Sequence, residues 1–149
     1  MGSEMCIRDR NNEAIEYYLK ALEAFTQWGG ENHLHVTTVL SNLGIAHTRL
    51  HQYKEAEAYV DRALTIRLGQ LEHNHPDVLH SRRLLATLQK AQGNLEAAQQ
   101  GYLDILAMHD ASNDDESSML ETLRMLGAVT DEMGEHAEAI VYYLSLIHI

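Results

Sequence analysis

The fold is decided by a stretch that reads HLHVTTVLSNLGIAHTRLHQYKEAEAYVDRALTIR from His33 to Arg67. Apolar residues recur in it at three- and four-residue spacing, which is typical of amphipathic helices. The polar pair His51-Gln52 separates two such runs. We therefore expect a helix over 33–50, a tight break, and a second helix over 53–68 that folds back on the first.

The same pattern returns from His75 to His109, as HPDVLHSRRLLATLQKAQGNLEAAQQGYLDILAMH. Three series of aligned residues, 41 or 42 positions apart, fix the period: Gly44, Ala86 and Gly127; Ala14, Ala56, Ala98 and Ala139; and Tyr18, Val60, Tyr102 and Tyr143. A small residue in mid-helix lets two helix backbones approach to about 8–10 Å, and a larger side chain fills the neighbouring groove. The period predicts a stack of helix pairs.

Further helices are expected on both sides of the first pair. The ranges are 11–27, 75–92, 95–108, 117–133 and 135–143. Asn74-His75-Pro76-Asp77 is a helix-start signature, because a capping side chain precedes a proline and an acidic residue in the first turn. Glycines mark several of the helix ends. With one proline and no strand-type alternation, seven helical segments predict an all-α protein.

At the aligned positions the sequence resembles a tetratricopeptide repeat (TPR) array, in which the second helix of each repeat carries an alanine, a large residue and another small residue. In the first full repeat the pattern reads Leu43-Gly44, Ala56, Val60 and Ala63. The period near 42 and the repeat start His75-Pro76-Asp77-Val78 are similar to the kinesin-light-chain type. The resemblance implies a right-handed superhelical solenoid of about three and a half repeats of antiparallel helix pairs, with first helices lining the concave side.

The repeat predicts the domain organisation. The ranges are a non-native or disordered leader over 1–10, a TPR array over 11–143 and a tail over 144–149; the array comprises a half repeat over 11–28, repeats over 33–69 and 75–109, and a truncated repeat over 116–143. SEMCIRDR at the start and LSLIHI at the end resemble translated sequencing-adapter read-through. We interpret both as non-native, with frayed termini as the alternative, and the whole as a window from a longer array.

Composition limits the function classes. Eleven basic residues against 22 acidic ones give a formal charge of −11, which repels nucleic acid and anionic membranes. No apolar run is long enough to span a membrane. Low cysteine use, with Cys6 alone, fits a reducing compartment and a cytoplasmic location.

Helical phase predicts which residues line the concave face. They are Ser41, Asn42, Ile45, Thr48 and Arg49, then Arg83, Leu84, Thr87 and Lys90, then Arg124, Met125, Ala128 and Asp131. Four of the eleven basic residues fall in this set, so we hypothesise a groove that accepts an extended acidic peptide. The alternative is that these charges are solvated and paired with nearby acidic residues.

The function expected is a protein–protein interaction scaffold, not an enzyme. Alternatives are a regulatory TPR module of a larger enzyme or signalling protein, and a self-associating structural solenoid. No nucleophile elbow, phosphate-binding loop or HExxH motif occurs. The pairs His33/His35, His73/His75 and His47/His51 lack a third ligand at a recognisable spacing, so neither a metal nor another cofactor is expected.

Overall fold

A computed structural model describes residues 2–109 and 116–147. These residues form seven α-helices, which confirms the all-α prediction. The chain divides into two compact units, the first ending at Leu71 and the second beginning at Glu72. Each unit is described by itself below.

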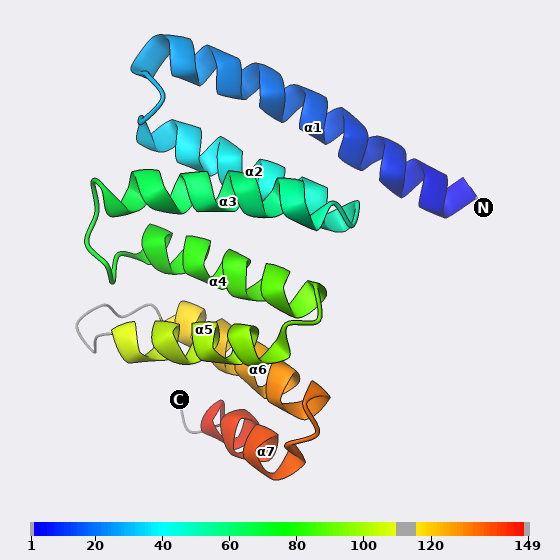
Figure 1. Cartoon of the computed structure of the whole chain (residues 1–149), viewed down its shortest axis with the longest axis vertical. Helices are drawn as coiled ribbons and strands as arrows, with labels where there is room; N and C mark the ends of the chain where they lie inside the picture. Colours follow the sequence, from blue (N-terminus) through cyan, green and yellow to red (C-terminus); the bar gives the residue numbers. More distant parts are fainter. Residues whose placement is uncertain (1, 110–115, 148–149) are drawn as a thin grey trace. The chain divides into compact units, whose positions relative to one another are not determined.

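Unit 1 contains α1 (Gly2–Gly29), α2 (Leu34–Arg49) and α3 (Tyr53–Leu68). Helix α2 packs against both α1 and α3 (Figure 1). A buried cluster of Val36, Leu40, Ala63 and Ile66 forms its core, and Leu22, Phe25 and Tyr59 pack around this cluster. Helix α2 therefore buries side chains on two sides, whereas an amphipathic helix on a surface buries only one.

Helix α1 starts earlier than the sequence pattern indicates. We expected it to begin at Asn11, but it begins at Gly2. Met5, Cys6 and Ile7 are exposed there. That this segment derives from read-through stays a prediction.

Unit 2 contains α4 (Pro76–Ala91), α5 (Leu95–Met108), α6 (Glu116–Glu132) and α7 (His136–Ser145). Helix α5 packs against α4 and α6, α7 packs against α6, and α4 also contacts α6 directly (Figure 1). The core consists of Leu79, Ala86, Ala98, Tyr102, Ile105, Leu126 and Val129. Core residues at helical spacing thus let each helix of unit 2 pack on its neighbours in the chain.

The aligned small residues lie where helices of a pair touch. A Cβ atom on Gly44 would collide with Val60, and one on Gly127 would lie 2.7 Å from the Tyr143 ring. In the middle repeat Ala86 replaces glycine, and the facing helix supplies the missing space through Gly101, where a Cβ would lie 3.1 Å from that of Ala86. Gly101 is unfavourable in a helix interior, and this close contact explains its presence.

Three turns inside the helix pairs share one hydrogen-bond pattern. The backbone N–H of Gln52 donates to His47 at 2.9 Å, and Asn94 and Glu135 donate to residues five positions earlier in the same way. The pattern needs a left-handed residue just after the helix. Gly93 and Gly134 supply it with φ of 84° and 85°, but the first turn uses His51 with φ of 59°.

Glycine at position 51 should therefore give a more stable unit 1 than alanine at the same position. We expect His51→Gly to have a free energy of unfolding about 1 kcal/mol above that of His51→Ala, because only the alanine keeps a Cβ in the left-handed region. The alanine variant is the reference because both variants lose the 2.9 Å contact between His51 Nδ1 and the Tyr53 hydroxyl. Urea unfolding measures the difference. Equal stabilities would contradict the argument.

Candidate functional site

The predicted groove residues of unit 1 lie on α2. Asn42, Ile45 and Thr48 are half-buried and Arg49 is exposed. Ser41 does not fit the prediction: it is 3% exposed, and its hydroxyl donates to the carbonyl of Thr37 in the same helix. The reason is that α2 packs against two helices, so its buried face is wider than the stripe assumed from helical phase.

Arg49 lines a hollow between α1 and α2 with Ile7, Arg10 and Asn11. The side-chain nitrogen of Asn11 is buried and has no hydrogen-bond partner. Two of the lining residues, Ile7 and Arg10, belong to the leader that we interpret as non-native. We therefore assign no function to this hollow.

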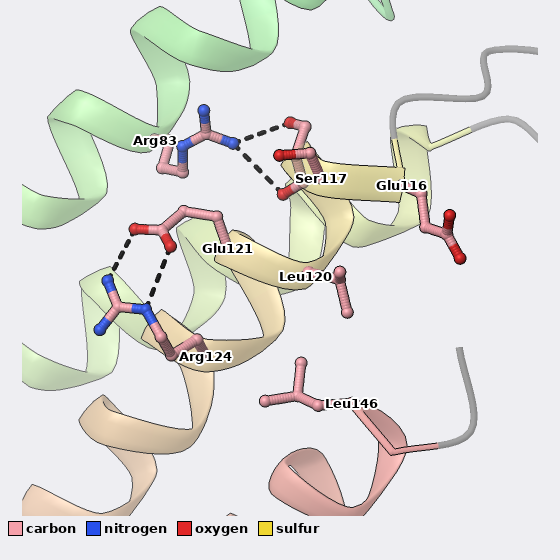
Figure 2. Close-up of a pocket in the computed structure, with 8 residues that line it drawn as sticks. Arg83, Glu116, Ser117, Leu120, Glu121, Arg124 and Leu146 are labelled. Carbon is pink, nitrogen blue, oxygen red and sulfur yellow. Dashed lines mark hydrogen bonds and ion pairs between the residues drawn. The ribbon is translucent and has the colours of Figure 1, made fainter.

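In unit 2 two of the predicted residues, one on α4 and one on α6, line an open hollow (Figure 2). It is lined by Arg83, Glu116, Ser117, Ser118, Leu120, Glu121, Arg124 and Leu146. Arg83 comes from α4 and Arg124 from α6, so the two guanidinium groups reach one hollow from different helices. Both residues were predicted from helical phase, and Glu121 was not.

Arg83 connects α4 to the first turn of α6. Its Nη1 donates to the Ser118 hydroxyl at 2.8 Å and to the Ser118 carbonyl at 3.3 Å. Thr87, one turn further along α4, donates to the Arg83 carbonyl at 2.9 Å and lies 2.8 Å from the Tyr102 hydroxyl. Arg83 is thus held in position by α6.

Arg124 forms a two-point ion pair with Glu121 on the same helix. Its Nε donates to Oε2 at 3.0 Å and its Nη2 donates to Oε1 at 2.7 Å. This hydrogen bonding to Arg124 is the main reason why the pKa of Glu121 lies below its usual value, and the charge of Arg83 lowers it further. Glu121 is therefore firmly ionised at neutral pH.

The remaining groove residues of unit 2 have local partners or lie partly buried. Lys90 Nζ lies 3.3 Å from Glu132, and Asp131 lies 2.6 Å from Nδ1 of His136. Leu84, Thr87, Met125 and Ala128 are half-buried, and Met125 packs against the core cluster. Glu121 is paired with Arg124 and Glu132 with Lys90, so this surface is not uniformly basic. These pairs agree with the alternative in which the charges are paired locally.

The histidines near the repeat starts have a structural role. Nδ1 of His33 accepts from the backbone N–H of His35 at 3.2 Å, and Nδ1 of His75 accepts from that of Asp77 at 3.1 Å. Both therefore cap the start of a helix, and of the two candidates Asn74 and His75 it is His75 that caps α4. Over residues 2–109 and 116–147 no group of three or more His, Cys, Asp or Glu side chains could hold a metal ion.

Of the residues lining the hollow only Arg83 and Arg124 were predicted, and the two that bond these arginines, Glu121 and Ser118, were not. Glu121 precedes Arg124 by three positions, a spacing that commonly gives ion pairs on helices and could have been noticed. Ser118 contacts Arg83 across 35 positions. Nothing in the local sequence indicates that contact, because it depends on how α4 and α6 pack.

Comparison with known proteins identifies the fold family. A family model described as tetratricopeptide repeat matches residues 5–69 and 36–111. No curated protein matches. The match describes a repeat scaffold, and neither it nor the similar structures identify a catalytic domain. In the described part of the chain, none of the helices is both long and apolar enough to cross a membrane.

Solved structures with a similar fold are kinesin-light-chain-like TPR proteins. BtubC (BKLC) from P. vanneervenii is 23% identical, with a TM-score of 0.83 over 94% of this chain and 56% of BtubC. Two structures of a Podosopora anserina kinesin-light-chain protein with nearly identical TPR-like repeats are 20% identical, with TM-scores of 0.75 and 0.74. These similarities cover 94% of this chain and 66% and 67% of the two Podosopora chains. The chain thus spans little more than half the length of BtubC. The family match over residues 5–69 and 36–111 shows that the chain belongs to the tetratricopeptide repeat family.

Proposed function

We propose that the chain is a protein–protein interaction module that holds an acidic, extended segment of a partner protein. TPR domains generally bind other proteins, and this family is the broad basis of the proposal. One observation carries the acidic preference: Arg83 and Arg124 line a single open hollow from two helices. Guanidinium groups bind carboxylates through two parallel hydrogen bonds, which gives both strength and orientation.

Neighbouring groups suit a peptide beside these charges. Ser117 at the rim of the hollow is exposed and carries a hydroxyl, and Leu120 offers apolar surface in the same hollow. A partner segment with acidic and aliphatic side chains would find complementary groups in unit 2.

The test compares peptide binding by the wild-type chain and by the double variant Arg83→Glu plus Arg124→Glu. The probe is a fluorescently labelled peptide of Glu, Ser and Leu residues, beside an analogue with Gln in place of every Glu. We expect the wild type to prefer the Glu peptide and the double variant to bind it about tenfold more weakly, since two ion pairs of up to about 1 kcal/mol each correspond together to at most about thirtyfold. Fluorescence anisotropy at low and high salt measures this.

A charge-matched control separates the hollow from net charge. Lys54 and Arg62 are exposed on α3, outside the predicted groove. Lys54→Glu plus Arg62→Glu changes the net charge by the same amount and should leave binding within about a factor of two, apart from weak long-range effects. Unchanged affinity in the Arg83/Arg124 variant, or equal losses in both variants, would refute the acidic-peptide function.

A further inference from the structure

We infer that Glu121 sets the selectivity of the hollow, because it occupies Arg124 until a stronger anionic segment displaces it. The inference rests on the proposed function and assigns a new role to a residue of the same site. It starts from the observation that two carboxylates of the protein itself line the site, Glu116 and Glu121, and that Glu121 is bonded to Arg124.

The geometry of that carboxylate is the geometry expected of a ligand. Both Glu121 oxygens accept from Arg124, at 3.0 and 2.7 Å, in the two-point arrangement that a peptide carboxylate would adopt. Figure 2 shows the Glu121 side chain reaching toward both Arg83 and Arg124 in the hollow. The positive charge of Arg83 also acts on Glu121, and both guanidinium groups keep its pKa below the usual value.

The two arginines differ in how they are held. Arg83 is fixed by the Ser118 hydroxyl and carbonyl on α6, so it can keep its position when the anion beside it changes. The side chains of Arg124 and Glu121 are 56% and 45% exposed and lie three residues apart on one helix. An exposed pair of this kind is weakly stabilised, and the Glu121 side chain can rotate away at little cost.

Selectivity follows from this competition. When a peptide with a single carboxylate binds, its carboxylate replaces that of Glu121 at Arg124, so the net gain in binding free energy is small. A segment with several acidic side chains reaches Arg83 as well, and its extra charge compensates for the displaced glutamate. Glu121 therefore weakens binding of all acidic peptides and does so most for those with one acidic residue.

The experiment uses Glu121→Gln, which keeps the shape of the side chain and removes its charge. The probes are the labelled Glu/Ser/Leu peptide with several glutamates and a version that retains one glutamate. We expect Glu121→Gln to tighten binding roughly threefold to fivefold, the amount that corresponds to an exposed ion pair. The gain should be larger for the peptide with one glutamate. Glu96→Gln, an exposed change of equal charge in the first turn of α5, should tighten neither peptide measurably.

The outcomes separate this inference from the proposed function. If the wild type binds the acidic peptide and Glu121→Gln binds it no tighter than Glu96→Gln does, the inference is overturned while the proposed function stands. If no variant binds any peptide, the proposed function fails. In that case a titration with sodium sulfate, monitored by the NMR signal of the Arg124 Nε–H, decides the inference. The signal must respond at a lower sulfate concentration in Glu121→Gln than in the wild type. An equal response overturns the inference.

Discussion

Gly44→Ala should destabilise unit 1 by about 2 kcal/mol, although alanine is the better helix former by about 1 kcal/mol. The reason is the packing of α2 on α3. The added Cβ would lie well inside the contact distance of Val60 Cγ2 and 3.4 Å from the Ala56 carbonyl oxygen. Val60 is 1% exposed and cannot turn away, so the helices must separate. Urea unfolding measures the loss.

A double-mutant cycle identifies Val60 as the cause. Val60→Ala removes the methyl group that the new Cβ would meet, so Gly44→Ala plus Val60→Ala should cost at least about 1 kcal/mol less than the two single changes together. Gly69→Ala is the matched control, because that glycine has φ of −73° and a Cβ there meets only ordinary contacts near 3.5 Å. It should be neutral or stabilising by up to about 1 kcal/mol. Additive costs would mean that the close approach at Gly44 is unimportant.

Local sequence determined much of the fold, because the helix ends depend on nearby residues. The bounds of α3 and α5 agree with the prediction, since a turn that the sequence marks precedes each helix. The start of α1 did not agree. The leader resembles adapter read-through, yet it contains no proline or glycine after Gly2 to interrupt a helix.

The candidate site was harder to predict, because helical phase gives the direction of a side chain but not its partner. Helical phase predicts that Arg83 and Arg124 lie on the same face, but it does not predict that Glu121 bonds Arg124 or that Ser118 bonds Arg83. Phase also placed Ser41 in the groove, where the packing of α2 on two helices buries it. Pairing and burial depend on tertiary packing, which a repeat period specifies only approximately.

Tyr102→Ala should have the largest effect on stability, at about 3–5 kcal/mol, because it would leave a cavity in the core of unit 2. Tyr102 is fully buried among Leu79, Ala98 and Ile105 in the core cluster. Tyr143 occupies the same position in the last repeat but is 38% exposed. Tyr143→Ala is therefore the matched control, and it should cost roughly 1 kcal/mol. Urea unfolding of both variants gives the comparison.

Tyr102→Phe separates the ring from its hydroxyl group. It should cost only about 1 kcal/mol, since it loses the 2.8 Å contact with the Thr87 hydroxyl and keeps the packing. Burial raises the pKa of Tyr102 above the usual tyrosine value, so the unfolded chain loses this proton at lower pH than the folded chain. Stability should then fall as pH rises above the usual tyrosine range, and Tyr102→Phe should reduce that alkaline loss. If Tyr102→Ala and Tyr143→Ala cost the same, the buried ring does not hold unit 2 together, and the packing assigned to this repeat position is wrong.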